Sequence, residues 1–382
     1  MKKVSLVKCI DYEYEKVKYA ISQSVNNLGG WDKYISKGDK VLLKVNLLMK
    51  KKPEEATTTH PVFVKTLADL LVEYGALVVI GDSPGGPFNE KVLKGIYKFC
   101  GYDDISNDDT ISLNYDVSSY EDTNPEGLLL KKLEVIGVLK SVDKVISVSK
   151  FKTHGMMVFT GAVKNMFGTI PGLVKAEYHY KMPNVDDFSN MLLDVCINAD
   201  PVLSFMDGIV GMEGNGPSAG NPIDVGLVIS SESPYHLDDI AVRIAGMDPY
   251  DVPTVKSSYE RGLCEENLQG CELVGEELKD HILDEFKYPS IQDVKFFKNR
   301  VPLFLERILD YNLRPRPEFD EKKCIGCGEC YRACPPDAIT MKDNFPSVDL
   351  MKCIRCYCCQ ELCPVKAVEI YRPWILRKIV KM

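Results

Sequence analysis

The sequence contains no apolar run that approaches the roughly 18 residues a helix needs to cross a bilayer. Its first residues, MKKVSLVKCIDYEYEK, carry lysines but none of the apolar stretch that marks a signal peptide. We therefore expect a cytoplasmic protein that has no membrane partner.

An excess of positive charge is also absent, because 47 Lys and Arg residues face 55 Asp and Glu residues and the net charge is −8. Proteins that bind nucleic acids usually carry basic patches, so we expect no nucleic-acid partner. The hydrophobic share of 45% and the charged share of 27% are typical of a globular protein. With 382 residues, the chain is long enough for one large or two ordinary domains.

Cysteine is scarce over the first 323 residues, which hold only five of the 14 cysteines. These five are Cys9, Cys100, Cys196, Cys264 and Cys271. None is spaced as a metal ligand, so we expect them to be small buried hydrophobic residues. The other nine lie between Cys324 and Cys363, whereas a secreted disulfide scaffold spreads its cysteines through a small domain. This dense block therefore indicates metal binding.

The cysteine block is an internal repeat in which residues 320–341 align with residues 349–370 at an offset of 29. Each copy reads C-x2-C-x2-C-x3-C-P, and in two-cluster ferredoxins the fourth cysteine of such a motif ligates the other cluster. Zinc sites usually use two C-x2-C pairs separated by a longer loop, so the pattern favours iron and sulfur. The spacing predicts two [4Fe–4S] clusters, the first on Cys324, Cys327, Cys330 and Cys363 and the second on Cys353, Cys356, Cys359 and Cys334.

A ninth cysteine of the block, Cys358, stands opposite Glu329 in the repeat, which is not a ligand position. We expect a free thiol beside a cluster that is dispensable for iron content. Residues 320–371 resemble the bacterial two-[4Fe–4S] ferredoxin domain motif for motif. The resemblance implies a small α+β domain that transfers single electrons between a protein donor or acceptor and an attached site.

Residues 1–291 alternate strand-like and helix-like segments. The predicted strands lie within 40–45, 76–86, 142–150, 201–211 and 223–230, and the predicted helices are 61–75 and one near 234–246. Apolar strands separated by helices predict an α/β domain with a mainly parallel sheet.

Residues 292–319 separate the two predicted domains. They read as a helix over 292–313 interrupted near Pro302, followed by an extended connector, because each proline disfavours helix at the residue before it. Residues 372–382 form a cationic tail that either packs on a domain or contacts a membrane.

The large domain resembles the domain-of-unknown-function 362 family, which is often fused to such a ferredoxin module. The resemblance lies in four segments: TTTHP (57–61), GDSPGG (81–86), SKFKTHGMMVFTGAVKNMFG (149–168) and MDGIVGMEGNGP (206–217). The family name implies no established reaction, so the residues themselves must indicate the chemistry.

Cations gather where a predicted strand ends, in the segment SKFKTH (149–154), and ligands of open α/β folds bind at that edge of the sheet. We assign catalytic roles to Lys152, His154 and Lys164, which could hold an anion and supply protons. Further candidates are Lys150 and Asn165, as substrate-binding residues, and Lys175 and His179. The alternative is a solvated basic face in which His154 is structural.

Two glycine-rich segments supply further candidates, although neither matches a nucleotide-binding fingerprint. Asp82 follows a predicted strand, and the glycines beside it let backbone approach a ligand closely; the alternative is a tight turn. Asp207 and Glu213 lie in what we predict to be a flexible loop at the lip of the site. Their carboxylates suit substrate or metal binding or acid–base work, and His60 suits either a site or a helix cap.

The sequence therefore predicts an iron–sulfur oxidoreductase. Two [4Fe–4S] clusters would relay electrons to a site in the α/β domain that acts on an anionic small molecule or on a further, unidentified cofactor. The alternatives are a non-catalytic electron-transfer or maturation protein, whose large domain binds a protein partner or a metal, and a redox sensor.

Overall fold

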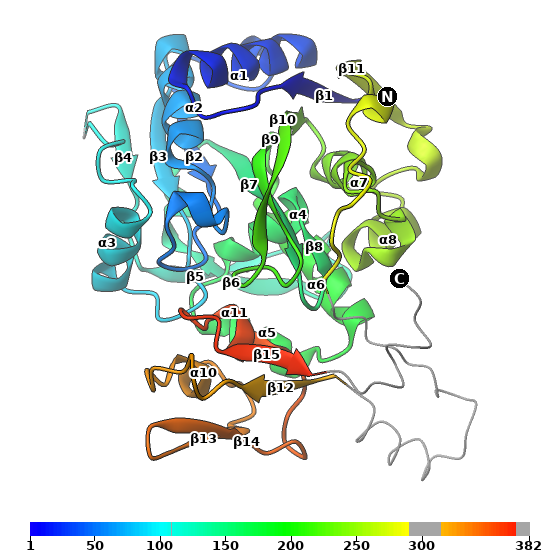
Figure 1. The fold of residues 1–382 in the computed structure, drawn as a ribbon. Coiled ribbons are helices and arrows are strands. Elements are labelled where there is room, and N and C mark those ends of the chain that lie inside the picture. The colour runs from blue at the N-terminus through cyan, green and yellow to red at the C-terminus, as the bar shows by residue number, and fades with distance from the viewer. Residues whose placement is uncertain (108, 290–314, 372–382) are drawn as a thin grey trace.

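The structure is a computed structural model that describes residues 1–107, 109–289 and 315–371 (Figure 1). The predicted helix over 292–313 and the tail at 372–382 lie outside the described residues. No helix in the described part of the chain is long and apolar enough to span a membrane.

The larger unit is built on one mixed sheet. Its strands are β1 (Lys2–Lys8), β2 (Lys40–Lys44), β3 (Leu77–Gly81), β4 (Ile111–Leu113), β7 (Lys144–His154), β8 (Val158–Thr160), β9 (Leu203–Glu213), β10 (Asn221–Ser231) and β11 (Cys271–Gly275). Their order is β11-β1-β10-β9-β7-β2-β3-β4, with β8 paired to β7 outside this path. A separate hairpin consists of β5 (Ser119–Thr123) and β6 (Lys132–Ile136).

The strands from β9 through β7, β2 and β3 to β4 are all parallel, and this block confirms the predicted α/β class. Only β10, with its neighbours β1 and β9, and the short β8 pair antiparallel. Because neighbouring parallel strands end at the same edge, the residues that follow β2, β3 and β7 meet there.

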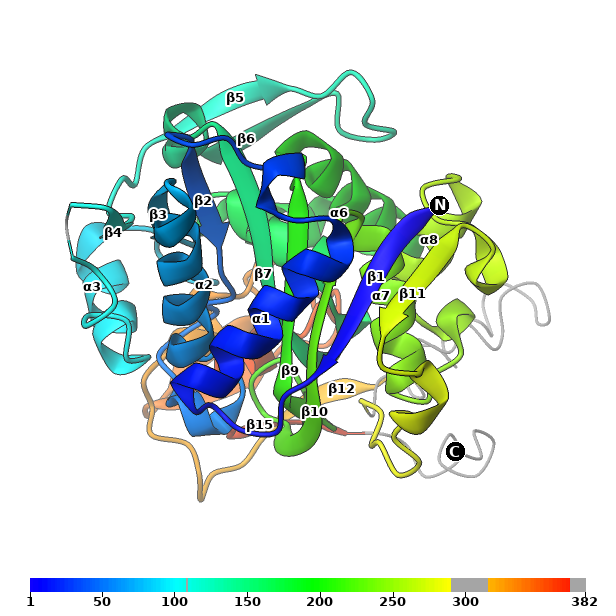
Figure 2. The same cartoon turned by 90° about the horizontal axis from the view of Figure 1, so that it is seen from above.

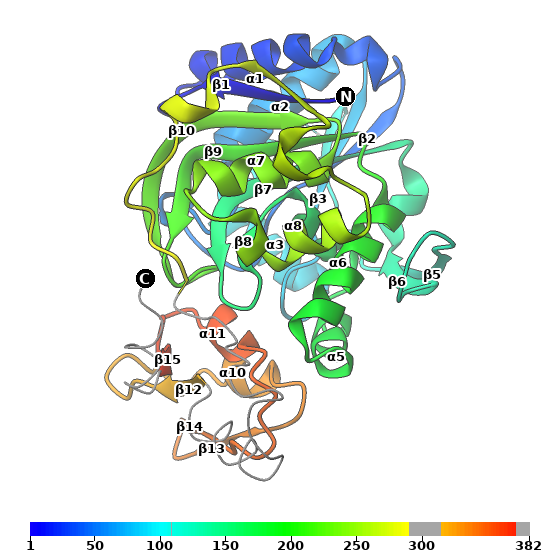
Figure 3. The ribbon, with the colours of Figure 1, turned by 90° about the vertical axis from the view of Figure 1, so that its right-hand side faces the viewer.

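Helices cover both faces of the sheet. They are α1 (Tyr14–Leu28), α2 (Pro61–Tyr74), α3 (Glu90–Phe99), α4 (Ala162–Asn165), α5 (Val174–Lys181), α6 (Val185–Ala199), α7 (Pro234–Ile244) and α8 (Pro253–Glu260). Helices α1 and α2 cross one face (Figure 2), while α6, α7 and α8 lie on the other (Figure 3). Alternate residues of β2 follow this division, since Val41 and Leu43 pack with α1 and α2 and Leu42 packs with α6.

Helix α2 illustrates how the sequence sets these boundaries. Pro61 occupies its first turn, where a missing N–H costs nothing, and the His60 side chain caps it by accepting from Val62 N at 3.3 Å. Gly75 ends the helix in a left-handed conformation with φ 112°. In between, Phe63 and Leu67 are fully buried, and each such side chain contributes about 1.5–3 kcal/mol.

The segment 206–217 is mostly strand rather than the flexible loop that its glycines predict, and this expectation was wrong. Strand β9 runs to Glu213, and the turn that follows is confined to 214–220. The reason is close packing: a Cβ on Gly208 would lie 2.9 Å from the Leu227 carbonyl, and one on Gly211 would lie 2.9 Å from Phe151.

The smaller unit lies against the carboxyl ends of the sheet (Figure 1). It consists of β12 (Arg316–Phe319), α10 (Glu329–Arg332), β13 (Ile339–Lys342), β14 (Phe345–Val348), α11 (Cys358–Glu361) and β15 (Val368–Tyr371). Strand β12 pairs with β15, and β13 pairs with β14. The 29-residue repeat is therefore a structural repeat, and β12 belongs to this unit although the sequence places its residues in a connector.

The repeat extends to backbone conformation. Gly326 and Gly328 have φ of 67° and 74°, and the equivalent Arg355 and Tyr357 have φ of 60° and 61°. Residues with side chains rarely adopt this left-handed conformation, so the fold of the cysteine loop imposes it on the second copy.

A buried ion pair joins the two central strands β7 and β9. Lys150 Nζ lies 2.7 Å from Asp207 Oδ2, and both side chains are inaccessible to solvent. Tyr12 donates its hydroxyl to Asp207 Oδ1 at 2.8 Å, and the His60 N–H donates to Oδ2 at 2.9 Å. Each charge is therefore compensated, as a buried charge must be.

We predict that Asp207→Ala lowers the free energy of unfolding by about 3–5 kcal/mol, because it leaves the Lys150 ammonium buried without a counter-ion. Lys150→Met combined with Asp207→Leu should recover much of this loss. Urea unfolding followed by circular dichroism measures the effect, with the exposed Asp224→Ala on β10 as control. A loss no larger than that of the control would contradict the assignment.

Candidate functional site

A cavity of about 100 Å³ lies where the small unit meets the carboxyl ends of β2, β3 and β7. The large unit contributes polar side chains: Asn46, Asp82, Ser83, Lys152, His154, Thr160, Lys164, Asn165, Lys175 and His179. The small unit contributes Ala333, Cys358, Glu361 and Leu362. The cavity is thus walled by both units at once.

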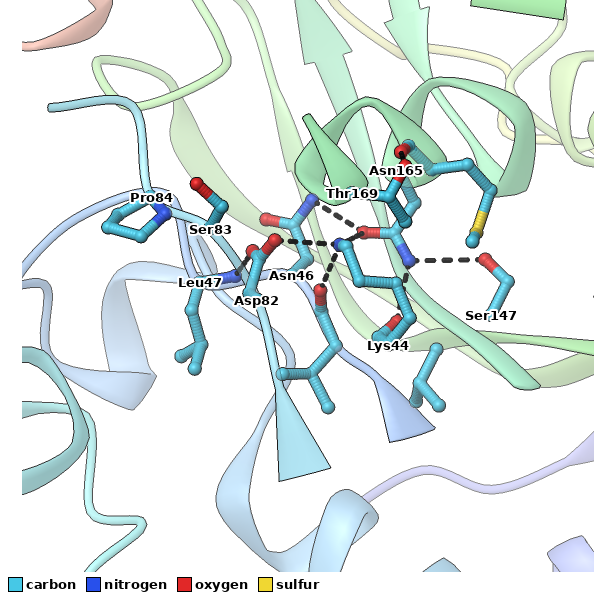
Figure 4. Close-up of polar contacts among 12 residues, drawn as sticks. Lys44, Asn46, Leu47, Asp82, Ser83, Pro84, Ser147, Asn165 and Thr169 are labelled. Carbon is cyan, nitrogen blue, oxygen red and sulfur yellow. Dashed lines mark hydrogen bonds and ion pairs between the residues drawn. The ribbon is translucent and has the colours of Figure 1, made fainter. Parts of the chain in front are cut away.

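The floor of the cavity is a buried polar network that follows β2 and β3 (Figure 4). Lys44 Nζ lies 2.8 Å from Asp82 Oδ1, and the other oxygen of Asp82 accepts from Leu47 N at 2.7 Å. Gly168 packs directly over this pair, since a Cβ there would fall within 1.9 Å of Asp82 Oδ1. Asp82 is therefore held in place by an ion pair and a backbone donor.

Asn165 ties α4 to the two neighbouring strands (Figure 4). Its amide nitrogen donates to the Lys44 carbonyl at 2.8 Å and to Ser147 Oγ at 3.1 Å. Its amide oxygen accepts from Asn46 Nδ2 at 3.3 Å. These contacts fix the end of α4, directly beside Lys164.

Lys152 is buried on β7, and its ammonium donates to Asn46 Oδ1 at 2.8 Å and to the Thr57 carbonyl at 2.6 Å. Both acceptors are neutral, so no carboxylate compensates the charge directly. Burial, followed by the positive charge of Lys164, lowers the pKa of Lys152 to about 7. An ammonium whose pKa lies near neutrality is suited to give up a proton.

His154 ends β7 and faces the small unit. Its Nδ1 accepts from the backbone N–H groups of Met156 and Met157, both at 3.1 Å. In the neutral ring the proton must then sit on Nε2, which lies 2.9 Å from Glu361 Oε1. Burial, followed by the charge of Lys164, lowers the pKa of His154 to about 4, so the ring is neutral at pH 7.

Three polar groups on the cavity wall have no hydrogen-bond or ion-pair partner within the described ranges. They are Lys164 Nζ, Thr160 Oγ1 and His179 Nδ1. Thr160 and His179 are only 3% and 4% exposed, and burial lowers the pKa of Lys164. A buried polar group without a partner costs about 1–3 kcal/mol, which a bound ligand could recover.

Lys175 projects from α5 to the turn after β3. Its ammonium donates to the Ser83 carbonyl and to Ser83 Oγ, both at 2.9 Å, and to the Pro84 carbonyl at 3.2 Å. Burial lowers the pKa of Lys175 to about 7.

The structure brings most of the sequence-predicted residues together. Those on the cavity wall are Lys152, His154, Lys164, Asp82, Asn165, Lys175 and His179. Three candidates lie elsewhere: Lys150 is in the ion pair with Asp207, Glu213 forms an ion pair with Lys287 at 3.0 Å, and His60 caps α2. In the described part of the chain, no three His, Cys, Asp or Glu side chains are gathered to hold a single metal ion.

Glu361 is the cavity residue that sequence reasoning missed. It lies two residues before Cys363, and its motif position holds Arg332 in the first repeat. Although burial opposes ionisation, His154 and Lys164 lower the pKa of Glu361 to about 2. The sequence offered one signal for Glu361, namely that the two repeats carry opposite charges at this position, Arg332 in the first and Glu361 in the second.

The hydrogen bonds that hold the small unit to the large one come, among the described residues, from the second repeat. Ser218 Oγ donates to the Glu361 carbonyl at 2.7 Å, Lys51 Nζ to the Pro364 carbonyl at 3.2 Å, and Lys366 Nζ to the Gly220 carbonyl at 3.1 Å. Because these contacts surround α11, this helix and its Cys358 are held against the cavity.

The cysteines gather in two groups. Cys324, Cys327, Cys330 and Cys363 line one small cavity together. Around Cys359, burial and then the nearby Cys356 and Cys353, together with Cys330 of the first group and Cys334, raise the pKa of Cys359 well above its ordinary value. Of the five scattered cysteines, Cys9, Cys100, Cys196 and Cys264 are buried as predicted, and Cys271 is partly exposed.

The molecule combines an α/β domain with a cysteine-repeat unit that closes a cavity rich in lysine side chains. This combination is that of an iron–sulfur protein, and comparison with known proteins supports this class. The model of the domain of unknown function DUF362 matches residues 41–243, and that of a 4Fe-4S dicluster domain matches residues 316–364. A thylakoid-associated protein of Synechocystis sp. is 30% identical over 294 residues, covering 76% of this chain and 89% of that protein. The chain belongs to the domain-of-unknown-function 362 family.

Solved structures resemble the chain more distantly. The lactate racemase apoprotein of Thermoanaerobacterium thermosaccharolyticum is 13% identical with a TM-score of 0.41, and the match covers 65% of this chain and 57% of that one. A Thermotoga maritima protein is 16% identical with a TM-score of 0.36, and the match covers 61% of this chain and 59% of that one. The chain spans less than two thirds of either structure.

Proposed function

We propose that the protein is an iron–sulfur oxidoreductase that reduces a small anionic molecule in the cavity between its two units. The observation that carries this proposal is the composition of the cavity wall. Cys358 and Glu361 of the second cysteine motif line it together with Lys152, His154 and Lys164 of the α/β domain. The proposed redox centre would therefore lie directly beside a pocket that carries lysine side chains.

The proposed cofactors are two [4Fe–4S] clusters, which carry single electrons when bound. The first would be held by Cys324, Cys327, Cys330 and Cys363, and the second by Cys353, Cys356, Cys359 and Cys334. The small cavity shared by the first four cysteines supports this exchange of the fourth ligand between repeats. The fourth cysteine of each repeat also accepts an equivalent backbone hydrogen bond. Ala338 N donates to Cys334 Sγ at 3.2 Å, and Ala367 N donates to Cys363 Sγ at 3.1 Å.

The two cysteine groups differ in their surroundings, and this difference supports a direction of electron flow. Cys327 of the first group is exposed, and Ile325 beside it is 65% exposed, so an electron-transfer protein can approach there. Cys358, which lies between Cys356 and Cys359 in the chain, lines the cavity wall. Electrons would therefore enter at the first group and leave at the second.

The large-domain residues would bind the substrate and supply protons. Lys164 provides a positive charge without a counter-ion at hydrogen-bond distance in the described structure, and Lys152 carries a proton whose pKa is about 7. His154, with its proton on Nε2, orients Glu361. We also propose a cytoplasmic location, because thiols stay reduced in that compartment.

Replacement of single cysteines tests the ligand assignment. We predict that Cys358→Ser retains about eight irons and eight sulfides per chain, whereas Cys363→Ser loses about half of each. Serine matches the size of cysteine, so the pair of variants isolates the ligand role. Equal losses in both variants, or zinc without sulfide in the native protein, would contradict the assignment.

Reoxidation of the reduced protein tests the proposed reaction. We predict that the dithionite-reduced holoprotein is reoxidised by at least one member of a panel of small anionic metabolites in anaerobic stopped flow. Lys152→Met with His154→Gln should slow this step by at least about 100-fold, because proton supply is lost. Lys181→Met, an exposed lysine on α5, serves as control.

Reoxidation by electron-transfer proteins alone, with no response to any small anion, would favour the non-catalytic alternative. Unchanged rates in the double variant would show that these two residues have no part in the reaction.

A further inference from the structure

We infer that the cavity binds a short-chain monocarboxylate, of about four to six non-hydrogen atoms. This inference rests on the proposed function in that it names the substrate class of the same site. It is drawn from the size of the cavity, its charge and the distribution of carbon and polar groups on its wall.

The size of the cavity favours a small ligand, or the small end of a larger one. An engineered cavity of about 150 Å³ holds benzene, which has six non-hydrogen atoms. By the same proportion, a volume of about 100 Å³ holds about four such atoms, and slightly more if side chains adjust. Carboxylates of two or three carbons fit wholly within this space, whereas nucleotides, flavins and sugar phosphates would extend well outside it.

The charge of the wall favours one negative charge on the ligand. Lys44 is neutralised by Asp82, and the ammonium groups of Lys152 and Lys175 already donate to neutral protein acceptors. Among the described residues of the wall, Lys164 is thus the cation left for a ligand, while the Glu361 carboxylate on the same wall repels additional negative charge. One negative charge on the ligand can pair with the Lys164 ammonium. A second negative charge would have no further uncommitted ammonium group among the described residues of this wall to pair with.

The unused hydrogen-bonding groups suit a carboxylate. Besides Lys164 Nζ, Thr160 Oγ1 and His179 Nδ1 have neither a hydrogen-bond nor an ion-pair partner among the described residues, and both side chains are more than nine-tenths buried. Two carboxylate oxygens can accept from these few groups. A tetrahedral oxoanion such as sulfate or phosphate has twice as many oxygens, and most of them would be left without donors.

Apolar side chains make up a large part of the remaining wall. Leu48, Phe167, Leu173 and Leu362 line the cavity with their side chains, and Leu362 is contributed by the small unit. Methyl or methylene groups of a ligand would replace water against these surfaces, which is favourable by about 0.8 kcal/mol per buried CH₂. In the described chain, one cation and two polar groups of the wall lack partners beside this apolar surface, and this arrangement matches an anionic head with a short aliphatic part.

Calorimetry with the oxidised holoprotein under anaerobic conditions tests this inference, with acetate, propionate, inorganic phosphate and sulfate as probes. We predict that acetate and propionate bind and that phosphate and sulfate bind at least about tenfold more weakly. Lys164→Met should weaken acetate binding by at least about tenfold, because a charged hydrogen bond is lost. Lys181→Met should leave the affinity unchanged.

If Lys164→Met does not fold, Thr160→Val, which keeps the side-chain shape, should still weaken acetate binding several-fold. Tighter binding of phosphate or sulfate than of acetate would overturn the assigned class, and so would the absence of carboxylate binding. Because no electron donor is present, the result is independent of turnover. A protein that binds acetate but is never reoxidised by small anions would instead contradict the proposed reaction.

Discussion

The contact between His154 Nε2 and Glu361 Oε1, 2.9 Å long, joins the two units of the protein at the wall of the cavity. It depends on the backbone donors of Met156 and Met157, which leave His154 no other place for its proton than Nε2. The contact holds α11 against the sheet and places a carboxylate beside the second cysteine group. The same pair of side chains therefore contributes both to the docking of the two units and to the charge of the cavity wall.

This arrangement explains why the two cysteine repeats have diverged. In the first repeat, Glu329 and Arg332 on α10 pair with each other at an exposed surface. In the second repeat, the same two positions hold Cys358 and Glu361, and both line the cavity. The repeat keeps its backbone and its cluster-binding cysteines, and it changes at the helix that faces the α/β domain. This asymmetry suits an electron-transfer module in which one cysteine group lies beside a bound ligand and the other contacts a partner protein.

The sequence predicted the elements well, because they depend on local spacing, and the assignment of the cysteines to two clusters stays a prediction. The strand–helix alternation, the caps of α2 and the 29-residue repeat all appear in the structure. The sequence also indicated that Lys152, His154, Lys164 and Asp82 lie at one site, because parallel strands end at the same edge of a sheet. The sequence could not show that Lys150 lies away from this site. Its position depends on the register shift between Lys150 and Lys152 and on the ion pair with Asp207, and both are tertiary features. Glu361 was beyond reach because its role depends on how the units dock.

The central claim is that the cavity and the second cysteine group form one electrostatic unit, and the reduction potentials of the clusters test it most directly. The measurement is a redox titration of native and Glu361→Gln holoprotein, followed by electron paramagnetic resonance. Removal of this negative charge should raise the potential of one cluster and leave the other unchanged, because net charge near a cluster sets its potential. Potentials that both stay the same, or that both shift equally, would contradict the account.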